Sequence, residues 1–172
     1  MPEEPLHSVH SSDRVSDVPK QIEIALPEHR VACTAVFHED LAPRTCAAIW
    51  GVLPHRGMAR HSYDTGREIW TPLEPLEEIK EVKENLVIYP QPGDCLYSYF
   101  PAAWEGGSRG RRISVYDFAI WYGPDSAIHT MSGFHPMNQF ATIVGGLDEF
   151  AAAASRLIID GETDIVITQQ DI

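Results

Sequence analysis

The sequence has no long hydrophobic run and little cysteine. No uninterrupted apolar run reaches the roughly eighteen residues that a membrane-spanning helix needs, so we expect no such helix and no membrane partner. Residues 1–14 lack the basic and then apolar order of a signal peptide, which favours a cytoplasmic location. Cys33, Cys46 and Cys95 are far apart and odd in number, so neither a disulfide framework nor a zinc site is expected. We predict no metal and no other cofactor.

Basic residues are also scarce. The chain has 13 Lys and Arg against 25 Asp and Glu, and its formal net charge of −12 repels a nucleic-acid backbone, so nucleic acid is not expected as a partner. Its 172 residues, of which 44% are hydrophobic, suffice for one well-packed domain. Residues 1–18 are polar and without periodicity, so we expect them to form an N-terminal arm and residues 19–172 to form the domain.

Short runs of alternating apolar and polar residues, typical of β-strands, recur along the chain. We predict strands at residues 21–26, 30–38, 58–63, 67–71, 85–89, 95–100, 112–122, 139–144 and 165–168. Residues 42–53 and 147–157 have helical spacing, and residues 76–82 fit either a helical turn or a charged loop. Both faces of the strand at 112–122 are apolar, which predicts a strand covered on both sides, as in a barrel with capping helices. Because the strands do not alternate with long helices, an antiparallel barrel is favoured over a βαβ sheet.

Four segments resemble the cyclophilin fold and follow one another in the same order. Asp-Leu-Ala-Pro-Arg-Thr at residues 40–45, between a strand and a short helix, is similar to the opening of that fold. Residues 92–99 (PGDCLYSY), 140–150 (FATIVGGLDEF) and 164–168 (DIVIT) resemble its later segments. The helix PRTCAAIW, with residues 66–70 and 92–94, is similar more narrowly to DUF3830, a bacterial group of cyclophilin-like proteins of undefined function. The resemblance implies a mainly β fold, a closed antiparallel cyclophilin-like β-barrel capped by two short α-helices.

Cyclophilins are prolyl isomerases that use the arginine of a Phe-His-Arg motif, and this chain departs from that motif. His61 aligns with the motif's histidine, and Ser62 replaces its arginine. Rotation about a prolyl amide has a barrier of about 20 kcal/mol unaided, so the loss of a preorganised cation predicts no efficient isomerase activity. An alternative left open is an isomerase in which Arg60 or Arg67 replaces the missing arginine. The catalytic candidates are Arg60, Arg67, His61 and Glu68.

The residues that replace the catalytic set form a candidate binding pocket. Aromatic walls with a few convergent polar groups suit a small molecule or a short peptide. The binding candidates are His61, Tyr63, Glu68, Trp70, Tyr97, Tyr99, Asp117, Phe118, His135, Asn138 and Gln139. Glu68 and Asp117 lie in apolar strands, so burial is expected to raise their pKa values unless an arginine pairs with them.

Three functions remain open on the sequence alone. The first is a protein that binds a small molecule or a short peptide in a remodelled groove, with or without a non-isomerase activity. The second is a prolyl isomerase with a displaced arginine. The third is an oligomeric structural or assembly protein whose exposed aromatic residues form the interface, with a homodimer as the candidate assembly.

Overall fold

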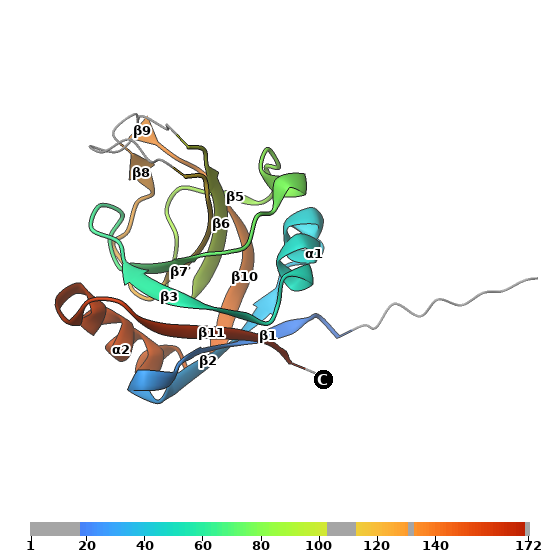
Figure 1. Cartoon of the computed structure of the whole chain (residues 1–172). Coiled ribbons are helices and arrows are strands. Elements are labelled where there is room, and N and C mark those ends of the chain that lie inside the picture. The colour runs from blue at the N-terminus through green and yellow to red at the C-terminus, as the bar shows by residue number, and fades with distance from the viewer. Residues whose placement is uncertain (1–17, 103–112, 131–132, 171–172) are drawn as a thin grey trace, which may run out of the picture.

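The chain folds into a closed antiparallel β-barrel (Figure 1). The computed structural model describes residues 18–102, 113–130 and 133–170. Eight strands form the ring in the order β2, β1, β11, β3, β4, β7, β6 and β10, and β10 pairs with β2 to close it. Their bounds are β1 (Gln21–Leu26), β2 (Val31–Phe37), β3 (His55–His61), β4 (Glu68–Pro72), β6 (Asp94–Phe100), β7 (Val115–Trp121), β10 (Met137–Gly145) and β11 (Thr163–Gln170). The predicted barrel is therefore confirmed, whereas the predicted arm, except for Val18, lies outside the described residues.

The alternation of apolar residues decides which side chains enter the barrel. In β2, Cys33, Ala35 and Phe37 are buried in the core, while the residues between them are half-buried or exposed. β1 has the same pattern, and a 3₁₀ turn, η1 (Pro27–His29), joins it to β2. This hairpin has nearly the bounds that the sequence predicts, because a period-2 pattern fixes the face that a strand presents to the core.

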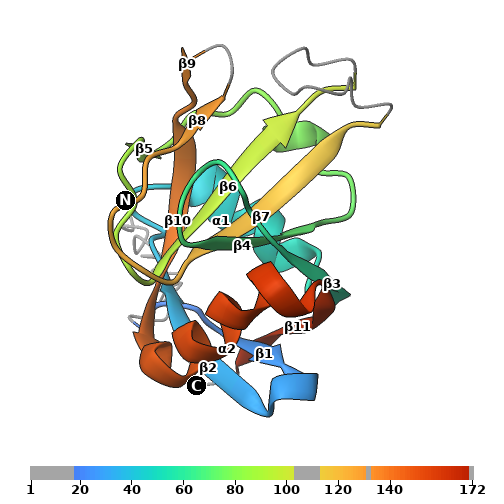
Figure 2. The ribbon, with the colours of Figure 1, turned by 90° about the vertical axis from the view of Figure 1, so that its left-hand side faces the viewer.

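Two helices lie on opposite sides of the barrel, as Figure 2 also shows. α1 (Pro43–Gly51) begins with a proline, which the first helical turn accepts because its missing N–H has no partner there. α2 (Leu147–Asp160) packs against β2 and β3 and buries one apolar stripe, which consists of Phe150, Ala153, Ala154 and Leu157. Both predicted helices are confirmed.

Strand β7 is buried along its whole length, as its sequence predicts. Its inward side chains, among them Phe118, belong to the core of the barrel. Its outward side chains Ala119 and Trp121 belong to a second apolar cluster with Ile128 and Met137. Segments around residues 128 and 137 therefore cover the outer face of β7, and the strand is covered on both sides as predicted.

Several predicted bounds are wrong. β3 begins at His55 and not at residue 58, because it pairs with β11 from His55 onward. β5 (Leu86–Val87) is shorter than the predicted strand at 85–89, and it adds to the edge of β10 outside the ring. Residues 76–82 contain a short 3₁₀ turn, η2 (Glu77–Ile79). The two-residue strands β8 (His129–Thr130) and β9 (Gly133–Phe134), which form a small hairpin, were not predicted.

Candidate functional site

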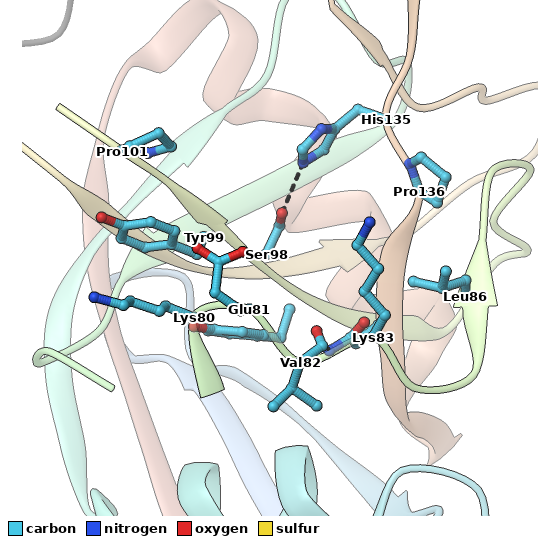
Figure 3. Close-up of a pocket in the computed structure, with 12 residues that line it drawn as sticks. Lys80, Glu81, Val82, Lys83, Leu86, Ser98, Tyr99, Pro101, His135 and Pro136 are labelled. Atoms are coloured by element: carbon cyan, nitrogen blue, oxygen red, sulfur yellow. Dashed lines mark hydrogen bonds between the residues drawn. The ribbon is translucent and has the colours of Figure 1, made fainter. Parts of the chain in front are cut away.

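A pocket of about 380 Å³ opens beside the end of strand β6 (Figure 3). The described pairing of β6 with β10 ends at Tyr97, which pairs with Asn138, whereas β6 continues to Phe100. The end of β6 therefore has no β10 neighbour, and the segment from residue 80 to residue 86 faces it across the pocket. The lining consists of Lys80, Glu81, Val82, Lys83, Leu86, Tyr97, Ser98, Tyr99, Pro101, His135, Pro136 and Asn138.

A serine and a histidine form a hydrogen-bonded pair in this pocket. The Oγ atom of Ser98 lies 2.7 Å from Nε2 of His135. The imidazole ring is held from another side by Phe100, with the two ring centres 4.8 Å apart and the planes nearly parallel at 26°. Burial lowers the pKa of His135, and the nearby charge of Lys83 lowers it further. The imidazole is therefore neutral at pH 7, and its Nε2 can accept the proton of the Ser98 hydroxyl.

Asn138 fixes the opposite wall of the pocket. Its side-chain amide donates to the carbonyl of Val82 at 2.9 Å and to Oγ1 of Thr45 at 3.2 Å. Its side-chain oxygen accepts the backbone N–H of Glu84 at 3.1 Å. The loop that carries Lys83 is therefore tied to β10 and to helix α1, and Asn138 acts as a positioning residue for the pocket.

Two lysines and one glutamate supply the charge of the pocket. Lys80 pairs with Glu77 at 3.0 Å, so part of its charge is already balanced. Lys83 has no ion pair with any described residue, and Figure 3 shows its side chain extending toward the side where His135 lies. Glu81 lies on the same loop. Lys83 is consequently the cation best placed to meet an anionic group in the pocket.

Four of the predicted binding residues line this pocket, namely Tyr97, Tyr99, His135 and Asn138. Sequence reasoning missed the other eight lining residues, among them Ser98, Lys83 and the two prolines. A signal for Ser98 was present, since it is the one small polar residue within the aromatic run Tyr-Ser-Tyr-Phe at residues 97–100. No comparable signal marked Lys83, because the charged segment around it has no regular pattern.

His61 and Glu68, predicted to share one site, lie on opposite faces of the sheet. His61 pairs with Ile69, which faces the core, whereas Glu68 is on the outward side with Trp70. On the inner side, Nε2 of His61 lies 2.6 Å from the hydroxyl of Tyr122. The structure therefore does not bring these two candidates together.

Glu68 is a buried carboxyl group, with 4% of the residue exposed. Burial raises its pKa to about 7, and the hydroxyls of Thr65 and Ser62 reduce this effect by hydrogen bonding. The Thr65 hydroxyl donates directly to the Glu68 carboxylate. The expectation that burial raises the pKa of Glu68 is confirmed.

The remaining predicted residues are scattered. Tyr63 is 80% exposed, and Phe118 is completely buried in the core against Phe140, with ring centres 5.0 Å apart. The side-chain amide of Gln139 donates to the Asp94 carboxylate at 2.7 Å. Asp117 is buried on β7 directly across from Ser98, which places it next to the pocket on the outer face of the sheet.

The two candidate arginines do not line the pocket. Arg60 forms a two-pronged ion pair with Glu162 at 2.7 and 3.2 Å, and its guanidinium lies 5.4 Å from the ring centre of Trp70. The side chain of Arg67 runs along Gly123, where a methyl group would lie 2.4 Å from its Cδ. Neither arginine lies beside Phe118, whose side chain is enclosed in the barrel core.

Two further kinds of site were searched for in the described ranges. No three His, Cys, Asp or Glu side chains in these ranges lie close enough together to hold a metal ion. None of the helices there is both long and apolar enough to cross a membrane.

Comparisons with known proteins agree with the fold. In the solved structure of McbB in complex with tryptophan, the similar region covers 88% of this chain and 45% of McbB, with a TM-score of 0.65 and 13% identity. The chain thus spans less than half the length of McbB. The hypothetical protein AF2241 from Archaeoglobus fulgidus has a TM-score of 0.51 and 19% identity, with 89% of this chain and 96% of AF2241 covered.

Both likenesses concern the fold alone, because the identities are low. No curated protein matches the sequence significantly. The family described as "Protein of unknown function (DUF3830)" matches residues 24–169, which is most of the chain. Together with the eight-stranded barrel, this match shows that the protein belongs to the cyclophilin-like DUF3830 family.

Proposed function

We propose that this protein binds a small organic molecule or a short peptide end, with a carboxylate group, in the pocket between β6 and the loop at residues 80–86. The observation that carries the proposal is the pocket itself. Its volume of about 380 Å³ lies within the roughly 300–1,000 Å³ that is usual for small-molecule sites. Its walls combine Tyr99, Pro101 and Pro136 with a few polar groups, which is the composition expected of such a site.

The charge of Lys83 indicates an anionic group on the ligand. The protein as a whole has a formal net charge of −12, so a small anion is repelled at long range unless a local cation attracts it. Lys83, which lines the pocket, supplies such a cation. The nearby Glu81 disfavours a ligand with several negative charges. A monocarboxylate with an apolar or aromatic body therefore fits the pocket best.

The positions of the arginines favour binding over prolyl isomerisation. Efficient isomerisation needs a cationic donor beside an apolar proline pocket. Arg60 is held by Glu162 and Trp70, and Phe118 is enclosed in the barrel. We therefore infer that isomerase activity is absent or weak. A protease-coupled prolyl peptide assay tests this inference, and acceleration that disappears in Arg60→Ala or Arg67→Ala would contradict it.

The binding test is a thermal-shift screen of the full chain against small aromatic and aliphatic monocarboxylates. Each hit is then titrated by calorimetry against wild type, Lys83→Met and Arg156→Met. Both variants lose one positive charge, but Arg156 is exposed on α2 and does not line the pocket. We expect Lys83→Met to weaken binding about fivefold or more and Arg156→Met to leave it unchanged. Equal weakening in both variants, or no hit at all, would reject the proposal.

A homodimer is a second candidate, supported by exposed aromatic residues beside the pocket. Tyr89 and Phe134 are 61% and 62% exposed, and their ring centres lie 5.9 Å apart. Leu86, which lines the pocket, is also exposed. Sedimentation of wild type and of Phe134→Ser tests this candidate. A dimer that dissociates in the variant supports it, and a monomer at every concentration excludes it.

A further inference from the structure

We propose that the pocket also catalyses acyl transfer, with Ser98 as the nucleophile and His135 as the general base, on small esters or thioesters of carboxylic acids. This inference rests on the proposed function, because the substrate enters the same pocket and the product is the carboxylic acid that the pocket binds. It extends that function from binding to a covalent reaction.

The geometry of the pair suits this chemistry. The 2.7 Å separation of Ser98 Oγ and His135 Nε2 lies within the roughly 2.6–3.2 Å that a nucleophile and its base require. Ser98 is in a barrel strand, paired with Asp117 of β7, and the stacked Phe100 ring fixes the plane of the imidazole. Both reacting groups line the pocket, so a bound ester can meet the hydroxyl without rearrangement of the sheet.

The surroundings of His135 favour the neutral imidazole, which is the form that can act as a general base. Lys83 approaches from the loop and, together with burial, keeps the ring unprotonated at rest. Asp117 on β7 is the direct cross-strand neighbour of Ser98.

The reaction balances without any further reagent. The Ser98 oxygen bonds to the acyl carbon while its proton passes to Nε2 of His135. The bond between the acyl carbon and the leaving oxygen or sulfur then breaks, and the leaving group takes the proton from His135. Water, deprotonated by His135, next attacks the acyl-serine, which releases the carboxylic acid and restores the Ser98 hydroxyl. The Lys83 ammonium lines the same pocket and has no ion pair with a described residue, and it can stabilise the oxyanion of each step.

The size and walls of the pocket limit the substrate. About 380 Å³ between Tyr99, Pro101 and Pro136 admits a small acyl group but not a folded protein segment. The single cation near the reacting pair favours esters of simple acids over polyanionic substrates. The class is therefore small, apolar esters and thioesters.

The test uses the full chain and p-nitrophenyl acetate as the probe. Release of p-nitrophenol is followed with time, and the acetylated residue is located by peptide mass spectrometry. In the wild-type protein we expect acetylation of Ser98. In both Ser98→Ala and His135→Gln the rate of p-nitrophenol release should fall about 100-fold or more. Ser155→Ala, which removes an exposed serine on α2, is the matched control and should react like wild type.

A pH profile separates general-base catalysis from a merely structural effect. Because the pKa of His135 is lowered, the wild-type rate should be level through neutral pH and fall only below the ordinary histidine value of about 6.5. His135→Gln keeps a hydrogen-bonding side chain, but the rate of this variant should no longer fall at low pH. Acetylation at another residue, an unreactive Ser98, or an equal rate in His135→Gln would each overturn the inference. If carboxylates bind in the calorimetric titration but Ser98 does not react, only the acyl-transfer inference fails; if they do not bind either, the proposed function fails as well.

Discussion

Replacement of Glu68 by glutamine should remove a large part of the pH dependence of the protein's stability. In the folded protein the pKa of Glu68 is raised to about 7 by burial, whereas in the unfolded chain it is near its ordinary value of 4.5. Between these values the folded protein holds a proton that the unfolded chain has lost, so the free energy of unfolding falls as the pH rises. This stabilising contribution is complete below pH 4.5 and is lost above pH 7.

The size of the effect follows from the two pKa values. Each pH unit between them changes the free energy of unfolding by about 1.4 kcal/mol, which gives roughly 2 to 3 kcal/mol between pH 5 and pH 8. The glutamine of Glu68→Gln has no charge to bury, so the free energy of unfolding of this variant should not decrease in this way between pH 5 and pH 8. The variant should therefore be more stable than wild type at pH 8. Thr65→Val removes the hydroxyl that lowers the pKa, so in that variant the loss should occur at higher pH.

Urea unfolding at pH 5, 6, 7 and 8, followed by tryptophan fluorescence, measures these free energies. Glu149→Gln is the matched control, because Glu149 is exposed in the first turn of α2. The free energy of unfolding of Glu149→Gln should differ from that of wild type by the same amount at every pH. If Glu68→Gln loses as much stability as wild type between pH 5 and pH 8, burial does not raise the pKa of Glu68 and the reasoning is refuted.

Three further substitutions test the packing, each by urea unfolding. Phe150→Ala should cost about 3 to 5 kcal/mol, because Phe150 is completely buried between α2 and the barrel, and a cost below 1 kcal/mol would contradict this packing. Gly146→Ala should cost more than about 1 kcal/mol, since Gly146 has a φ of 77° and a methyl group there would lie 2.6 Å from the carbonyl oxygen of Ala32. Arg60→Ala should cost less than about 1 kcal/mol, because its ion pair with Glu162 is exposed, and a larger cost would show that Arg60 supports the barrel.

The sequence predicts most of the barrel because several of its strands alternate apolar and polar residues. β1 and β2 both show the period-2 pattern, and a shift by one residue would reverse the face that enters the core. The hairpin of β8 and β9 could not be predicted in this way, because two-residue strands have no period. The sequence also did not show which segment covers the outer face of β7. Ile128, which packs there, lies in an irregular segment before that hairpin and belongs to no periodic pattern.

The candidate site was predicted less well because it depends on strand register. His61 and Glu68 belong to adjacent strands, and their pairing places them on opposite faces, which composition alone does not show. His135 was predicted as a pocket residue, but its partner Ser98 was not, because a serine between tyrosines also fits simple packing. Only the end of the β6–β10 pairing shows why the pocket forms there.

The central claim is that a small carboxylate ligand occupies the pocket beside the end of β6. Amide chemical shifts of the full chain, measured by NMR while a screening hit is added, test it most directly. The account predicts saturable shifts concentrated at Lys83, Ser98, Tyr99 and His135. Shifts that centre on Glu68 and Tyr122, or that are spread evenly over the barrel, would contradict it.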